Sequence, residues 1–428
     1  MQKTLLIMLV SAGVLWGSSL PELTRYALRH SPMIQVAKAK SALAKLSRQA
    51  SQAARYGELD LVGDYTHYNI ERTLAPLPPS AMKSPEPITT TKDVFSLGLT
   101  YNVPLFTGGA LRRQVEIDQI ASVMSEGSLK LSKEQLVYNI RTLYLTALSL
   151  QEILQAQRTH THALKQLEKQ IAKEVAVGRK APIEQYKSQA DIAASQTQEE
   201  VLQANIEITK ATLGSLAGTT VHSLTPVKFS LKAPHYSTRK LLQKIPGLTK
   251  LKLEMLQLKK ARKMIQKAQA ANQPQVNLSA YAGQNFGEDR ITDDWDRESL
   301  WQVSLKGKYN LIDFGKRAIN EEKAQVGLLQ AQIHLQQVTL EIKKQLLEAI
   351  QKIKLSYAEY RGNSAQHRLS QKSAQIEKVR YENGASTLND LLLAQSKVQF
   401  AKAKVIQSRY DYQKNRYYLD YILEKGIK

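Results

Sequence analysis

The sequence contains no cysteine among its 428 residues. This absence excludes disulfide bonds, thiolate metal sites and a cysteine nucleophile. It also excludes a lipid-modified N-terminal cysteine, so any attachment to a membrane must come from the fold. Long apolar runs are absent too. After the first residues no stretch reaches 18 consecutive apolar residues, so we expect no transmembrane helix.

Acidic residues are few relative to basic ones, with 38 Asp and Glu against 60 Lys and Arg and a formal net charge of +22. Such a balance raises the question of nucleic-acid binding. The basic residues, however, are spread among Gln, Glu and Ala, and they form neither a compact cluster nor a recognition motif. We therefore expect no nucleic-acid partner.

Signatures of catalysis and of cofactor sites are also missing. The chain has no phosphate-binding glycine loop, no metal-type histidine spacing and no nucleophile elbow. His160 and His162 form the one close histidine pair. Two positions apart on a helix, they point in different directions. We therefore expect no enzymatic activity, no cofactor and no metal.

The first residues are typical of a secretory signal peptide. Lys3 gives a positive start, an apolar stretch follows, and Gly17-Ser18-Ser19 offers small residues for cleavage after Ser19. A buried first helix is the alternative, but the apolar run is short and a polar helix follows. Export without a transmembrane helix leaves the soluble periplasm, the cell exterior or a β-barrel in an outer membrane.

Proline is absent from two long stretches, residues 110–176 and 316–381, and the last proline of the chain is Pro274. Each stretch predicts an uninterrupted helix of about 66 residues, roughly 100 Å long. Apolar positions in both stretches alternate steps of four and three, which predicts a coiled-coil seam with left-handed supercoiling. The seam positions are Leu136, Ile140, Leu143, Ala147, Leu150 and Leu154 in the first stretch, and Ile342, Leu346, Ala349, Ile353, Ser356 and Tyr360 in the second.

The sequence repeats itself with an offset of 206 positions. Residues 95–109 align without gaps on residues 301–315, and Gly178 aligns on Gly384. Each copy predicts a strand, a glycine turn, a very long helix, a second glycine and a return helix, which indicates duplicated architecture. The predicted organisation is a signal peptide at 1–19, a first repeat at 20–218, a linker at 219–236 and a second repeat at 237–428. Ser31-Pro32 and Ile245-Pro246 are predicted to begin matching helices that run up to the strands.

Period-two alternation predicts strands at 95–105 and 301–311, each with a partner strand upstream, at 59–69 and 275–284. About 10 residues is the length of a tilted membrane-spanning strand. The polar face of the strand at 301–311 includes two lysines, Lys306 and Lys308, as a face lining the lumen of a channel would. A soluble amphipathic hairpin is the alternative. The connections at 71–93, with five prolines, and at 285–299, with six acids, are predicted to be exposed hairpin loops.

Two short segments, 177–184 and 383–390, are predicted to turn each long helix into its return helix. Gly178 and Gly384 fit the left-handed conformation that ends a helix. Pro182 fits the first turn of the next helix. From the residues alone, both segments are capped helical hairpins.

At this point the chain resembles the TolC-like outer membrane factor family. The resemblance covers nearly the whole mature chain, and the order and spacing of its motifs carry it together with the internal repeat. The matching segments are Leu20–Pro32, Val103–Gly109, Asn310–Gly315 and Tyr381–Gln395. The first is similar to the family's mature N-terminus, the next two to its strand-to-helix turns, and the last to its second hairpin tip.

The resemblance implies a mainly α protein with a small β part, built as a trimer. Each copy would give four strands to a shared twelve-stranded transmembrane β-barrel, surrounded by outer membrane lipid, and its long helices to a tunnel across the periplasm. The residues agree, because two hairpins cannot close a barrel alone and open sheet edges are not tolerated in lipid. The implied function is an outer membrane channel for efflux or type I secretion, which receives cargo from an inner-membrane transporter and a periplasmic adaptor protein.

The resemblance also assigns roles at the hairpin tips, which would close like an iris and dock on the adaptor. The tip residues implied in docking are Gly178, Arg179, Lys180, Gly384, Ala385 and Ser386. Asp390 matches the family's constriction acid, which would form a ring of three carboxylates and select cations. Tyr381 matches a tyrosine that bonds to the neighbouring hairpin, where Glu184 holds the acidic position. Leu393 stands where some members have a second acid, and Ser386 where some have an arginine.

A soluble periplasmic coiled-coil adaptor or scaffold is the alternative function. Such a protein has no need of two matched hairpins with apolar outer faces. The strands therefore discriminate between the two functions.

Overall fold

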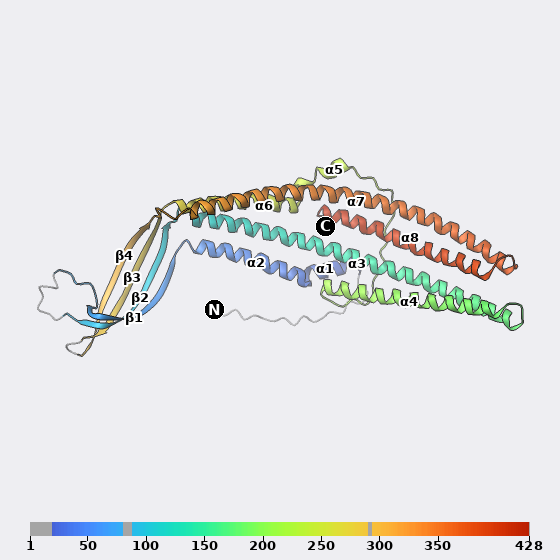
Figure 1. The fold of residues 1–428 in the computed structure, drawn as a ribbon, viewed down its shortest axis with the longest axis horizontal. Coiled ribbons are helices and arrows are strands. Elements are labelled where there is room, and N and C mark those ends of the chain that lie inside the picture. The colour runs from blue at the N-terminus through green and yellow to red at the C-terminus, as the bar shows by residue number, and fades with distance from the viewer. Residues whose placement is uncertain (1–18, 80–87, 290–292, 428) are drawn as a thin grey trace. The chain divides into compact units, whose positions relative to one another are not determined.

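The structure is a computed structural model that describes residues 19–79, 88–289 and 293–427 (Figure 1). The chain is mainly helical with one four-stranded antiparallel sheet, which confirms the predicted fold class. The described residues form two compact units. The first contains the chain up to Ala39, Gly127–Lys252 and the part from Gln336 onward, and the second contains Lys40–Glu126 and Leu253–Leu335. Each unit draws on both halves of the sequence.

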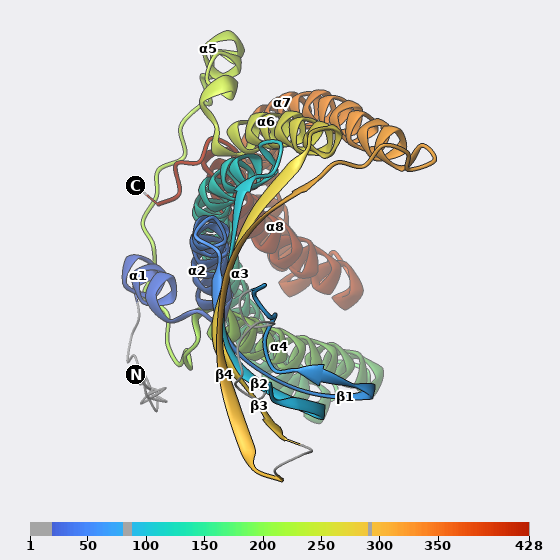
Figure 2. The ribbon, with the colours of Figure 1, turned by 90° about the vertical axis from the view of Figure 1, so that its left-hand side faces the viewer.

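The sheet belongs to the second unit. Its strands are β1 (Glu58–Thr73), β2 (Thr90–Phe106), β3 (Gln275–Glu288) and β4 (Trp295–Lys308). They lie in chain order and every neighbouring pair is antiparallel, so β1 and β4 are the edges (Figure 2). The register places Leu61, Leu99, Ala282 and Trp301 in one row across the sheet. This face is mostly apolar and the other mostly polar, as the alternation predicts.

The strands differ from the predicted ones at their ends. β4 ends at Lys308, so the predicted strand residues Tyr309 and Leu311 lie outside it. The predicted acidic loop at 285–299 was wrong in extent, because β3 continues to Glu288 and β4 begins at Trp295. Two of the acids, Asp296 and Glu298, lie on the polar face of β4, and an exposed strand tolerates charge on such a face. The first connection is also shorter than predicted, and residues 80–87, with two of its five prolines, lie outside the described residues.

The long helices have the predicted length and spacing. Both α3 (Ala110–Ala176) and α7 (Lys316–Glu382) contain 67 residues, and α7 begins 206 positions after α3. The return helices are α4 (Pro182–Ala217) and α8 (Leu388–Ile422). In Figure 1 each of them runs back along its long helix.

The helices before the strands match the prediction in the first repeat and depart from it in the second. They are α2 (Pro32–Ala53) and α6 (Thr249–Gln269), with a single 3₁₀ turn, η3 (Ala270–Asn272), after α6. Pro32 begins α2 as expected. Ile245–Gly247 instead forms a separate 3₁₀ turn, η2, and α6 begins only at Thr249. Pro246 and Gly247 both disfavour a continuous helix here, which explains the later start.

The first unit holds the main apolar core. Short helix α1 (Leu20–His30) packs there against α3, α4 and α8 through buried residues such as Leu23, Ile140 and Leu213. The predicted seam positions Leu136, Ala147, Leu346 and Ile353 are all buried, which confirms the coiled-coil spacing. Of the predicted signal peptide, only Ser19 lies within the described residues, where it precedes α1.

The segment between the repeats is held against this core by side chains of the helices. The Tyr144 hydroxyl donates to the Thr225 carbonyl oxygen at 2.8 Å. The Tyr412 hydroxyl donates to the Lys232 carbonyl oxygen at 2.7 Å. The segment ends at the short helix α5 (Thr238–Leu242). Among the described helices, none has both the length and the apolar character needed to cross a membrane.

Candidate functional site at the helical hairpin tips

Both hairpin tips turn through the same hydrogen-bonded motif. The Arg179 amide donates to the Glu174 carbonyl at 2.8 Å, and the Ala385 amide donates to the Arg380 carbonyl at 2.8 Å. Gly178 and Gly384 precede these amides with φ values of +75° and +71°. This is the Schellman arrangement, which satisfies carbonyls left free at the end of a helix. An added Cβ at either glycine would meet no atom within 4 Å, so the positive φ alone requires glycine.

The two return helices begin differently after these turns. Pro182 opens α4, which has no side-chain cap. In α8 the Thr387 hydroxyl accepts from the Asp390 amide at 3.2 Å, and the Asp390 carboxylate accepts from the Thr387 amide at 3.2 Å. This capping box satisfies two free donors of the helix start. Asp390 therefore has a structural role beside the predicted pore role.

The electrostatics of Asp390 favour its charged form. Hydrogen bonds from the Thr387 hydroxyl and then from the Thr387 amide hold the pKa of the carboxyl below its ordinary value. The side chain is exposed, so burial opposes this only weakly. At neutral pH the Asp390 carboxylate is thus a fixed negative charge at the tip.

A polar contact joins the two hairpins at their tips. The Tyr381 hydroxyl of α7 donates to Glu184 Oε2 of α4 at 3.0 Å. Lys180 Nζ donates to the same hydroxyl and lies 3.6 Å from the centre of the Tyr381 ring. The Lys180 ammonium also lies 3.2 Å from the Glu174 carboxylate and 3.5 Å from that of Glu184. We call Glu174, Lys180, Glu184 and Tyr381 the tip cluster.

The tip cluster is sheltered from water. Tyr381 is 8% exposed and packs with Ile171, Leu388 and Leu391. Burial alone would lower the pKa of Lys180, but the bonds to Tyr381 and Glu174 outweigh it and raise that pKa above its ordinary value. Burial also raises the pKa of Tyr381. The cluster thus holds a protonated lysine and a neutral phenol at neutral pH, and charge-assisted bonds of this kind are stronger than exposed ion pairs.

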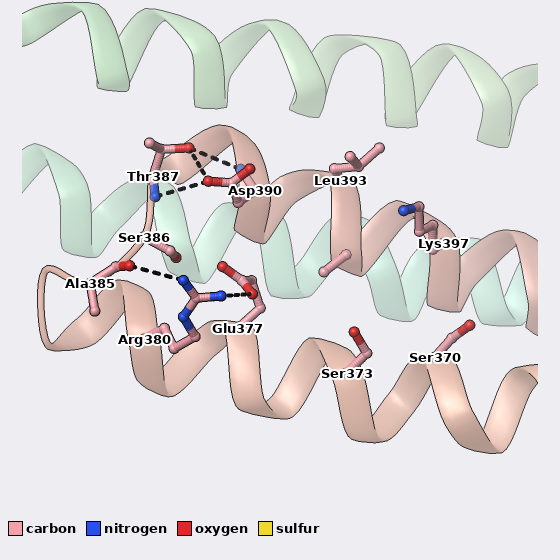
Figure 3. A pocket seen from close by; sticks show the side chains of 11 residues that line it. Ser370, Ser373, Glu377, Arg380, Ala385, Ser386, Thr387, Asp390, Leu393 and Lys397 are labelled. Carbon is pink, nitrogen blue, oxygen red and sulfur yellow. Dashed lines mark hydrogen bonds and ion pairs between the residues drawn. The ribbon is translucent and has the colours of Figure 1, made fainter.

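A polar groove of 540 Å³ lies beside the second tip, between α7 and α8 (Figure 3). Arg380 donates to the Ala385 carbonyl oxygen at 3.2 Å and to Glu377 at 3.3 Å. Asp390 and Leu393 line the groove from α8. Leu393 is 51% exposed, so this leucine keeps an apolar surface open to water beside the charges.

The structure brings together some of the predicted site residues and separates others. Tyr381, Glu184 and Lys180 meet in the tip cluster, whereas Asp390 and Leu393 lie on the groove of the second tip. Arg179 is exposed at the first turn. The remaining predicted residues, Gly178, Gly384, Ala385 and Ser386, form the turns themselves.

Sequence reasoning missed three features of the site. The first is that Lys180, predicted only as a docking residue, bonds across the hairpins to Tyr381 and pairs with Glu174 of its own hairpin. The second is Arg380, which supports the second turn. The third is the capping box, whose Thr-x-x-Asp spacing was visible in the sequence. Among the described residues, no group of three or more His, Asp and Glu side chains is placed to hold a metal ion.

Comparison with solved structures identifies the fold. The outer membrane protein VceC of Vibrio cholerae superposes with a TM-score of 0.78 at 18% identity, covering 96% of this chain and 97% of that one. The CmeC outer membrane channel of Campylobacter jejuni gives a TM-score of 0.80 at 16% identity, covering 95% and 86%. The MtrE outer membrane channel of Neisseria gonorrhoeae, in its open state, gives 0.75 at 15% identity, covering 96% and 89%. At these identities the likeness shows the fold alone.

A comparison with curated proteins found no match. The sequence profile of the outer membrane efflux protein family, by contrast, matches residues 23–219 and 249–423. The matched ranges include both long helices, all four strands and both tips. This protein therefore belongs to the outer membrane efflux protein family, whose members are outer membrane channels.

Proposed function

We propose that this protein is the exit duct of a tripartite efflux or type I secretion system. Cargo would reach it from an inner-membrane transporter through a periplasmic adaptor protein, and the transporter would supply the energy. Family membership supports an outer membrane channel. The observation that carries the gated duct is the tip cluster, because Lys180 and Tyr381 connect two helical hairpins that must separate for a closed end to open.

The proposed duct is a homotrimer. In the described chain the sheet has four strands with free edges at β1 and β4. An unpaired strand edge leaves backbone donors and acceptors that lipid cannot satisfy. Three copies joined edge to edge form a closed barrel of twelve strands, which removes every free edge.

The proposed constriction is a ring of Asp390 side chains, one from each copy. The lowered pKa of Asp390 keeps each carboxylate charged at neutral pH. Three such charges around an axis attract cations and repel anions. The tip cluster would hold this ring narrow. The open state named for the MtrE channel supports a conformational change of this kind in the family.

The proposed adaptor contact is made by the turns after α3 and α7. Arg179, Gly384 and Ala385 are exposed there. Both turns are fixed by backbone hydrogen bonds, so they offer a preformed surface to the tips of a partner.

Planar-bilayer recording of the detergent-purified protein tests this function. We expect discrete conductance steps with cation preference, and we expect Asp390→Asn to reduce that preference. Membrane pellets washed with carbonate provide the matched check on location. A protein that is released by the wash and gives no conductance would contradict the channel and support the soluble scaffold.

A further inference from the structure

The two edge strands of the sheet carry opposite charges on the same face. The register joins Glu58 on β1 through Asn102 and Ser279 to Ser304 on β4, so these four residues share one face. Side chains alternate along a strand. Asp60 and Asp64 on β1 therefore lie on this polar face, and so do Lys306 and Lys308 on β4.

Four of these charges, Glu58, Asp60, Lys306 and Lys308, lie near the same end of the two edges and are unused within the described chain. All four side chains are exposed. Within the described residues, Glu58, Asp60, Lys306 and Lys308 form no side-chain hydrogen bond or ion pair. The inner strands β2 and β3 instead place small or neutral polar side chains on this part of the face, and the Ser279 hydroxyl donates to Asn102 Oδ1 at 2.6 Å.

Closure of a barrel by identical copies slides one edge along the other. Strands tilt by about 40° and lie about 4.8 Å apart, so four strands displace the next β1 by roughly five residues along β4. Sliding one way brings Glu58 and Asp60 level with Lys306 and Lys308. Sliding the other way brings them level with Asp296 and Glu298, which occupy the same polar face.

We propose that β4 of one copy pairs with β1 of the next in the first of these two registers. Lys306 and Lys308 then face Glu58 and Asp60 across the joint, on the polar face of the barrel. Because the twist of a sheet has a fixed hand, a closed barrel slides in one direction only. The opposite charges that meet across this joint point to the first register. This inference rests on the proposed trimer, in which β1 and β4 are the edges that meet, and it specifies which charges align them.

Charge reversal at each edge, singly and together, tests the joint. The first variant is Glu58→Lys with Asp60→Lys, the second is Lys306→Glu with Lys308→Glu, and the third combines all four changes. Size-exclusion chromatography in detergent measures the trimer fraction, and circular dichroism checks that helix content is unchanged. We expect each single-edge variant to lose about tenfold in trimer fraction, because every joint then sets like charges opposite each other. The combined variant restores attraction and should recover the trimer.

Two further measurements separate this inference from its premise. Lys92→Glu is the matched control for Lys306→Glu, because Lys92 lies on the inner strand β2 and the change should leave the trimer intact. Since the chain has no cysteine, engineered pairs report the register directly. On oxidation we expect covalent oligomers from Val62→Cys with Ser304→Cys, and none from Val62→Cys with Asp296→Cys, the pair that the opposite slide would bring level.

The outcomes are distinguishable. A wild-type protein that forms no trimer contradicts the proposed function and this inference together. A wild-type trimer with single-edge variants that stay fully trimeric overturns the inference and leaves the proposed function standing. Loss without recovery in the combined variant, or cross-linking through position 296, likewise overturns it.

Discussion

At the scale of single residues, Lys180 has the largest predicted effect on the gate. Its ammonium contacts two carboxylates, Glu174 and Glu184, and the hydroxyl of Tyr381. Lys180→Met keeps most of the aliphatic stem and removes all three contacts. Hydrogen bonds to charged groups contribute about 1.5–3 kcal/mol each. We therefore expect open probability in planar bilayers to rise by at least about tenfold.

Lys187→Met is the matched control for this change. Lys187 is an exposed lysine on α4, seven positions after Lys180. It should gate like the wild type. If both lysine variants open the channel equally, the effect comes from lost positive charge in general and not from the tip cluster.

Asp390 predicts how selectivity responds to pH. Its folded pKa lies below the ordinary value of 3.8, so its charge is fully present above that value and is lost as pH falls through the lowered pKa. Reversal-potential measurements should show constant cation preference from pH 7 to about pH 5, with a decline only below about pH 4. In Asp390→Asn the preference should be small and should not change across this window. A wild-type decline that begins near pH 6 would point to a histidine and contradict the assignment.

At the scale of elements, replacing glycine by alanine is expected to have opposite effects on stability at the tip turn and inside α7. Gly384→Ala forces a Cβ into a positive φ and should cost about 1–2 kcal/mol in the free energy of unfolding. Gly362→Ala lies in an ordinary turn of α7 with open space around it and should gain up to about 1 kcal/mol. Urea denaturation followed by circular dichroism measures both. Equal signs for the two variants would show that φ does not control the turn.

Element boundaries show which parts of the fold are local. The ends of α3 and α7 were predictable because Gly178 and Gly384 act within one turn of the chain. The end of β4 was not predictable from the sequence. Tyr309 and Leu311 continue the apolar alternation, but they lie beyond the last residue pair between β3 and β4, which is Gln275 with Lys308. Strand length depends on the partner strand, and a single sequence does not give that. Lys180 was misjudged for the same reason, since Glu174 and Tyr381 reach it only after the hairpins pack.

At the scale of the whole chain, Glu424 ties the end of the second repeat to its beginning. Glu424 follows α8 with a φ of +52°, which is unusual for a residue with a side chain. Its carboxylate accepts from the Lys250 amide at 3.0 Å, at the start of α6, and lies 3.1 Å from the Lys130 ammonium of α3. The next residues continue the contact, because the Gly426 amide donates to the buried Glu134 carboxylate at 2.7 Å. Three helices thus meet through the last residues of the chain.

This arrangement predicts that the side chain of Glu424 matters more than its backbone. Glu424→Gly relaxes the left-handed backbone but removes the bonds to Lys250 and Lys130. The carboxylate is only 7% exposed, so we expect a net loss of about 1–3 kcal/mol, measured by urea denaturation. Glu424→Gln, which keeps an acceptor for the Lys250 amide, should lose less. A more stable glycine variant would mean that backbone strain outweighs the side-chain bonds, and the chain end would then be a passive consequence of the packed helices.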